Sequence, residues 1–245
     1  MNYFGFEQDL EPFERFSEQT SAQIIEDNAH GFLSRDKDNN LLGQRTKFGV
    51  TSFRKTIQVV DGATLATTLS EDDIPKQVEF LNQSVEIRSK LLRTFSHIEK
   101  KTKLPIVGAA QFASRSIRFV RTGSKFLTSD PEVENRIPGV VNPHATSIER
   151  MLSVDQYSEI NRRRNLFIKI LPEVQKLKFD PIFTDLPDGV CPYGLPVYAP
   201  IESKKLLSKL ARRYRVTLMT WPELPSAILP TSPDHYKQVW LLNFR

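Results

Sequence analysis

A short apolar stretch that runs into two acids and then a histidine is the feature that most constrains this chain. Gln23–Ile25 leads into Glu26 and Asp27, and His30 follows Asp27 after a three-residue step. In open α/β sheets, ligands lie outside the carboxyl ends of the strands. We therefore expect an α/β domain in which Asp27 stands at a strand end and faces a ligand.

A second group of chemically useful residues follows within a short distance. Ser52 and Phe53 precede Lys55, and a turn containing Gly62 comes next. A lysine can form an imine with an aldehyde and later move a proton at a substrate carbon. An acid such as Asp27 can pair with a protonated pyridine nitrogen. Together these are the groups that a pyridoxal phosphate (PLP) enzyme requires.

The first half of the chain predicts short strands and helices. We expect a strand end at Tyr3–Phe6, a helix around Glu11–Glu18, a strand at Gln23–Ile25, a loop or hairpin at Gly31–Gly43, and strands at Phe48–Phe53 and Thr64–Thr68. From Pro75, apolar residues recur near helical spacing up to about Lys101 and predict one long helix. Residues 104–140 show no sustained period, which indicates loops with short helices.

The second half predicts a different unit. A helix is expected to open at Thr146, where Glu149 completes a capping box, and Ser153 with Gln156 repeats this signature before a second helix. The further expected elements are a strand at Leu195–Ala199, a helix at Ser203–Tyr214, and strands at Val216–Met219 and Val239–Phe244. We therefore predict two domains: residues 1–150 form a partial large α/β domain that binds the cofactor and has a helical and loop extension, and residues 151–245 form a small α+β domain.

Composition narrows the class of protein. The 245 residues are 39% hydrophobic and 26% charged, which is typical of a soluble globular protein with one large or two modest domains. No apolar run approaches the roughly 20 residues that a membrane span needs. Met1–Gly5 has neither a basic nor an apolar leader, and Cys191 is the single cysteine. A reducing compartment, by default the cytoplasm, is therefore expected.

The net charge of +5 raises the alternative of a basic, partner-binding protein. The basic residues are dispersed beside apolar ones, around positions 100–103, 115–121, 162–164 and 212–215, and no recognition motif accompanies them. Solvated faces explain this pattern, so no nucleic-acid partner is expected. Cys191 and the histidines show no ligand spacing, so no metal site is expected. Trp221 is expected in the core of the small domain rather than against substrate.

The order of these residues resembles that of the DegT/StrS aminotransferase family, which has PLP fold type I. Glu26–His30 is similar to the family's acid-Asp-x-Ala run at a strand end. Ser52 and Phe53 are similar to the Ser-Phe motif before its imine-forming lysine, matched by Lys55. Further similar stretches are Arg162–Asn165, Leu195–Val197 and Trp221–Pro225.

The resemblance implies a role for each matched residue. Asp27 pairs with the pyridinium nitrogen, His30 neighbours the phenolate oxygen, Ser52 binds the phosphate, and Lys55 forms the internal aldimine and acts as the catalytic base. The implied reaction transfers an amino group from a small-molecule donor to a carbonyl acceptor. The implied assembly is a homodimer with sites at its interface. Other PLP chemistry, such as dehydration, stays open.

Three departures from the family pattern bear on this expectation. Ser52 and Lys55 are three residues apart, two fewer than in the sugar aminotransferases. Ala63 replaces the second glycine of the turn, and Asn2 stands where a histidine is common. The family's N-terminal segment, with its phosphate-binding residues, has no counterpart here. We therefore expect either a fragment or one piece of a split enzyme, with a catalytically inert remnant of such an enzyme as the alternative.

Overall fold

The computed structural model describes residues 1–57, 59, 61–70, 143, 145–222, 228 and 230–244. All of them belong to one of the two units into which the chain divides, Met1–Ile74 with Pro143–Arg245; the other unit is Pro75–Asn142. The long helix predicted up to Lys101 and the loops predicted for 104–140 therefore lie outside the described residues. The domain boundary placed at residue 150 stays a prediction. Among the described residues, no helix has both the length and the apolar character to cross a membrane.

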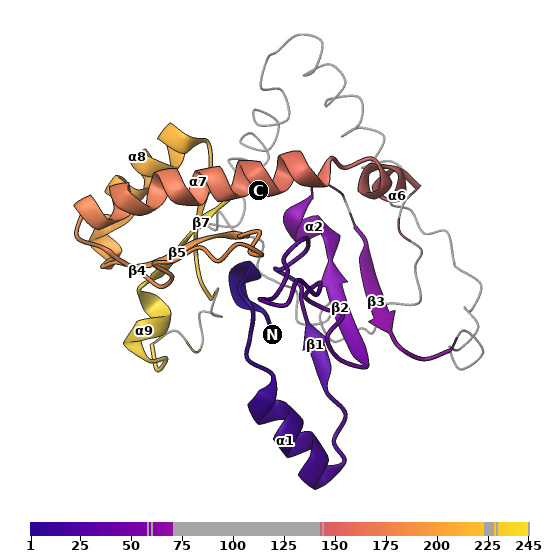
Figure 1. The fold of residues 1–245 in the computed structure, drawn as a ribbon. Helices are drawn as coiled ribbons and strands as arrows, with labels where there is room; N and C mark the ends of the chain where they lie inside the picture. Colours follow the sequence, from indigo (N-terminus) through magenta and orange to yellow (C-terminus); the bar gives the residue numbers. More distant parts are fainter. Residues whose placement is uncertain are drawn as a thin grey trace, which may run out of the picture. The chain divides into compact units, whose positions relative to one another are not determined.

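The N-terminal sheet has three strands in the order β1-β2-β3 (Figure 1). They are β1 (Ile25–Asp27), β2 (Phe48–Ser52) and β3 (Ala63–Thr67). β1 runs parallel to β2, and β3 runs antiparallel to it. The strands predicted around β2 and β3 are confirmed. The first strand begins two residues later than predicted, so that Asp27 is its last residue.

The N-terminal segment is not the predicted strand end. Tyr3–Gly5 forms a short 3-10 helix, η1, in which Phe4 has φ 57° and Gly5 has φ 93°. Both angles belong to the left-handed region, which an extended strand excludes. A side chain at Gly5 would also lie 2.5 Å from the carbonyl oxygen of Cys191, so only glycine fits this close approach. The helix predicted next is confirmed as α1 (Glu11–Thr20).

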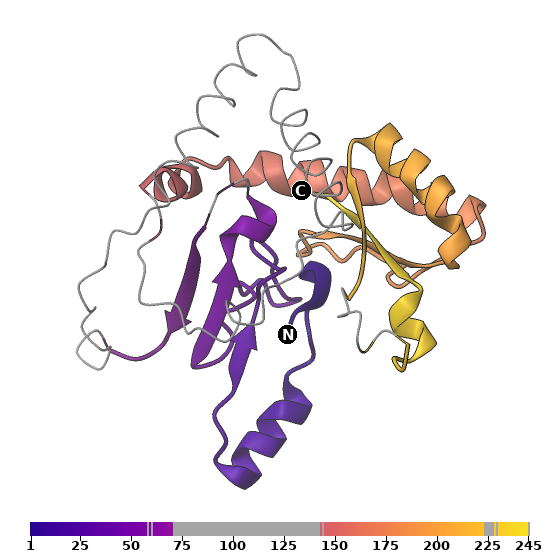
Figure 2. The ribbon, with the colours of Figure 1, turned by 180° about the vertical axis from the view of Figure 1, so that it is seen from behind.

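The second sheet is antiparallel and has the order β4-β5-β7-β6. Its strands are β4 (Asp180–Pro181), β5 (Gly194–Tyr198), β6 (Thr217–Thr220) and β7 (Val239–Asn243). The other helices of the described chain are α2 (Phe53–Thr56), α6 (Ala145–Leu152), α7 (Gln156–Lys176), η3 (Ile201–Ser203), α8 (Lys204–Tyr214) and α9 (Asp234–Lys237). α7 packs against β4 and β5, and α8 packs against β6 (Figure 2). The strands and the helix predicted here are confirmed, apart from shifts of one residue at their ends.

Apolar side chains of α7, β5 and β7 form the core of the second sheet. α7 contributes Phe167, Ile170 and Val174, which recur at steps of three and four residues and are fully buried. β5 and β7 add further fully buried side chains to the same core: Leu195, Val197, Leu241 and Leu242. Phe4 and Phe6 belong to the same cluster. The N-terminal segment is therefore packed into the core of a sheet formed far along the chain.

The start of α7 differs from the predicted capping box. Asp155, not Ser153, is the N-cap: its carboxylate accepts hydrogen bonds from the Ser158 amide at 3.0 Å and from the Ser158 hydroxyl at 2.7 Å. A carboxylate is favoured here because it also interacts with the positive end of the helix dipole. α6 begins at Ala145, one residue before the predicted cap.

One buried guanidinium connects three of these elements. Arg163, on α7, is completely buried and donates to the Glu159 carboxylate at 2.6 Å. It also donates to the carbonyl oxygen of Thr56 at 2.6 Å, and to those of Pro192 and Tyr193 at 3.3 and 3.4 Å. Arg163 therefore fixes α7, the end of α2 and the segment that leads into β5 against one another.

We expect the substitution Arg163→Met to lower the free energy of unfolding by about 3 kcal/mol, because it leaves buried carbonyl groups without donors and removes one partner of Glu159. The matched control is Arg213→Met, whose exposed ion pair with Glu173 should contribute at most about 1 kcal/mol. Urea unfolding monitored by circular dichroism measures both. Equal unfolding midpoints for the two variants would contradict the role given to Arg163.

Candidate active site

The sheet brings three of the four predicted site residues together. Asp27 ends β1, His30 follows it in the loop, and Lys55 lies on α2 directly after β2. Because β1 and β2 are parallel, their carboxyl ends meet at one edge of the sheet. The Nζ atom of Lys55 lies 3.3 Å from Nε2 of His30. Asp27 interacts electrostatically with both of these side chains.

The fourth residue, Ser52, is less closely connected. It is the last residue of β2 and the N-cap of α2, and its hydroxyl makes no capping hydrogen bond. Within the part of the chain that the structure describes, no hydrogen bond joins its hydroxyl to another residue. Ser52 thus stands one helical turn from Lys55, and its role in binding phosphate stays a prediction.

His30 lies in an aromatic enclosure. Its side chain is 1% exposed. Its ring stacks on Tyr193 at 4.6 Å between centroids and on Phe4 at 5.6 Å, and the ring of Trp221 meets it at a steep angle at 4.9 Å. Burial, and next the positive charge of Lys55, lower the pKa of His30 from 6.5 to about 4, against the opposing effect of Asp27. The imidazole is therefore neutral at pH 7.

The hydrogen bonds of this ring bear on how it contacts the lysine. The Phe4 amide donates to Nδ1 of His30 at 3.4 Å, which assigns the ring proton to Nε2. A protonated Nε2 facing Lys55 can donate only to a neutral amine. Burial also lowers the pKa of Lys55, with a contribution from Arg54 and against the effect of Asp27. A lower pKa raises the share of Lys55 that is a neutral amine, which is the nucleophilic form.

Asp27 keeps part of its carboxylate available. Its Oδ1 atom accepts a hydrogen bond from the Ala29 amide at 2.9 Å, and its backbone carbonyl accepts one from the Asn2 amide at 2.8 Å. The other carboxylate oxygen has no hydrogen-bond partner among the described residues. This oxygen can accept a hydrogen bond from a protonated ring nitrogen.

The neighbouring acid, Glu26, has a structural role. Successive residues of a strand point to opposite faces, so Glu26 is buried where Asp27 faces the site. Asn2 donates to Glu26 at 2.8 Å, and the Arg45 guanidinium lies 2.7 Å from it. Burial alone raises the pKa of Glu26, but the hydrogen bonds from Asn2 and Arg45 outweigh it and lower the pKa. This charged cluster holds the strand that ends in Asp27, and it uses Asn2, where the family pattern commonly has a histidine.

The aromatic enclosure of His30 was only partly predictable. Trp221 packs against the core of the second sheet, as predicted, but also against His30. No local pattern in the sequence distinguishes Tyr193. Its stacking on His30 joins positions far apart in the chain.

No protein-family model matches the sequence, and no curated protein matches it. Solved structures do match the fold. One is a DegT DnrJ EryC1 StrS aminotransferase from Brucella abortus, with a TM-score of 0.51, 15% identity, and coverage of 99% of this chain and 57% of that chain. Another is Helicobacter pylori PseC, an aminotransferase involved in the biosynthesis of pseudoaminic acid, with a TM-score of 0.52, 15% identity, and coverage of 99% and 59%.

The chain therefore has the fold of these aminotransferases over the part that it spans, which is less than two thirds of either protein. The predicted fold class, a partial PLP fold type I large domain followed by a small α+β domain, is confirmed. The resemblance to the DegT/StrS family, predicted from the motifs, is confirmed at the level of the fold.

We expect the His30 ring to titrate near pH 4 in the folded protein and near 6.5 in urea, as followed by nitrogen-edited NMR of the imidazole. Because the unfolded chain takes up this proton first, the free energy of unfolding should fall as pH drops from 6.5 to 4, by up to roughly 3 kcal/mol. His30→Gln should flatten this part of the profile. A folded-state pKa above 6.5 would exclude the neutral pair with Lys55.

Proposed function

We propose that this chain is a PLP-dependent aminotransferase of the DegT/StrS type in which Lys55 holds the cofactor covalently. The observation that carries the proposal is the contact of Lys55 with His30, beside Asp27, in this fold. The residues fit the cofactor: the lysine is disposed to be a neutral amine, and Asp27 has a carboxylate oxygen available. When bound, PLP supplies an electron sink for charge that develops at the substrate's α-carbon.

Each side chain has a distinct task in this proposal. Asp27 accepts a hydrogen bond from the ring nitrogen and keeps it protonated. His30, through its Nε2 proton, would donate toward the phenolate oxygen. Lys55, once free, would take a proton from the substrate's α-carbon and deliver it to the cofactor carbon on the other side of the shared nitrogen, which is a 1,3-proton shift. Ser52 donates its hydroxyl to the phosphate.

The substrates follow from this reaction type. We propose a small-molecule amino donor and a carbonyl acceptor, a cytoplasmic setting and a homodimer. The aromatic enclosure around His30 supports the proposed proton transfers, because apolar walls beside Lys55 exclude water.

One observation favours a second candidate, a catalytically inert protein that keeps the fold. Ser52 is the single residue proposed for the phosphate among the described positions, and its hydroxyl has no partner that fixes its direction. Each charge-assisted phosphate contact contributes about 1.5–3 kcal/mol, so the loss of several weakens PLP binding by orders of magnitude. The following two experiments separate the candidates.

With PLP and borohydride, we expect a stable mass adduct on the peptide that contains Lys55. Lys55→Ala should abolish this adduct, because no other amine contacts His30 in the described structure. Lys47→Ala is the matched control and should retain it, since Lys47 is an exposed lysine over the Phe48 ring. Equal labelling of wild type and Lys55→Ala would refute the role of Lys55, and no labelling at all would favour the inert protein.

We expect Asp27→Asn to retain the borohydride adduct but to slow reaction with an amino donor by about 100-fold or more, because an amide does not keep the ring nitrogen protonated. Stopped-flow absorbance of the PLP-loaded protein measures the rate. Asp9→Asn, in an exposed loop, is the control and should leave the rate unchanged. An unchanged rate in Asp27→Asn would show that this carboxylate does not act on the ring.

A further inference from the structure

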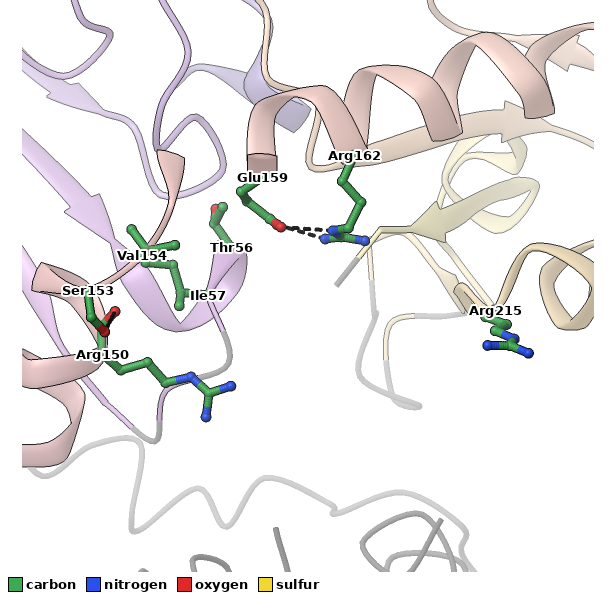
Figure 3. A pocket seen from close by; sticks show the side chains of 8 residues that line it. All are labelled: Thr56, Ile57, Arg150, Ser153, Val154, Glu159, Arg162 and Arg215. Carbon is green, nitrogen blue, oxygen red and sulfur yellow. Dashed lines mark hydrogen bonds and ion pairs between the residues drawn. The ribbon is translucent and has the colours of Figure 1, made fainter. Parts of the chain in front are cut away.

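A basic pocket lies beside the end of α2 and does not include any of the four proposed site residues. It has a volume of about 520 Å³ and is formed by residues of α2, α6 and α7 and by Arg215, which follows α8 (Figure 3). In Figure 3, Arg150 and Arg215 stand on opposite sides of the opening, and the paired Glu159 and Arg162 lie between them. Segments from both halves of the described chain therefore converge on this pocket.

The pocket carries an excess of positive charge. Arg150, Arg162 and Arg215 are all solvent-accessible and line it. Among the described residues that line it, Glu159 is the single carboxylate, and that group is already paired with Arg162 at 2.7 Å and with Arg163 behind it. Three guanidinium groups against one carboxylate leave two positive charges. The guanidinium groups of Arg150 and Arg215 make no hydrogen bond or ion pair within the described part of the chain.

Thr56, one of the residues that line the pocket, carries a buried hydroxyl. Thr56 lines the pocket and is 4% exposed, yet its Oγ1 atom has no hydrogen-bond partner among the described residues. Buried hydroxyl groups are normally hydrogen-bonded, so a group of this kind requires an explanation. Because this atom is itself covered, a ligand in the open pocket reaches the guanidinium groups and not this hydroxyl.

We propose that this pocket binds a dianionic phosphate group, free or esterified to a small organic molecule. A phosphate at pH 7 carries about −1.5 to −2 charge and three acceptor oxygens, which complements the net charge of the lining. Guanidinium groups suit it because their planar donors bind phosphate oxygens in pairs. Ile57 and Val154 add an apolar wall against which an organic substituent can pack.

The test is calorimetric titration of the purified chain with inorganic phosphate and with phenyl phosphate. We expect saturable binding, weakened at least tenfold in Arg150→Gln/Arg215→Gln. The control is Arg15→Gln/Arg212→Gln, which removes the same charge from exposed helical positions. Circular dichroism confirms that each variant is folded. Tighter binding of phenyl phosphate would identify an esterified ligand, and equal binding would identify free phosphate.

Two results would overturn the proposal. The first is the absence of saturable binding, or equal weakening in the control variant, which would mean general charge attraction. The second is loss of phosphate binding in Lys55→Ala or Ser52→Ala with no loss in the double arginine variant, which would assign the phosphate to the proposed cofactor site. Since the borohydride adduct on Lys55 is measured separately, failure here and failure of the proposed function are distinguishable.

Discussion

The buried guanidinium of Arg163 is the contact on which the candidate site depends. Its bond to the Thr56 carbonyl fixes the residue after Lys55, and its bond to the Tyr193 carbonyl fixes the ring that stacks on His30. One charged group therefore positions both members of the contact between Lys55 and His30. A buried cation is tolerated here because Glu159 and three carbonyl groups surround it.

The burial of His30 is the main cause of its lowered pKa. A low dielectric disfavours charge on both the imidazole and the lysine amine, and two adjacent cations would add repulsion. The neutral pair, with a proton shared between nitrogen atoms, avoids both costs. Asp27 opposes this, because its negative charge favours protonation of both neighbours. The amine stays reactive because Asp27 forms no close ion pair with it in the described structure.

Local patterns in the sequence predicted most strands and helices, because apolar periodicity and turn residues act within short windows. The motif order predicted Asp27, His30 and Lys55 as site residues, and the structure brings the three together, while their roles stay predictions. Positions that depend on distant contacts were missed. Tyr3–Gly5 departs from the extended strand end predicted there because it packs against Cys191, and Tyr193 reaches His30 only through the fold. Side chains along β1 alternate between the two faces of the sheet, so Glu26 and Asp27 point in opposite directions once the register of the strand is known.

The shortened spacing between Ser52 and Lys55 has a geometric consequence. These residues occupy the N-cap of α2 and the third position after it. In a helix, positions three apart lie on the same side, so the shorter motif keeps Ser52 beside Lys55 instead of separating them. Thr56, the next residue, must then point elsewhere, and it lines the basic pocket. The four-residue helix α2 therefore presents Lys55 to the proposed cofactor site and Thr56 to the basic pocket.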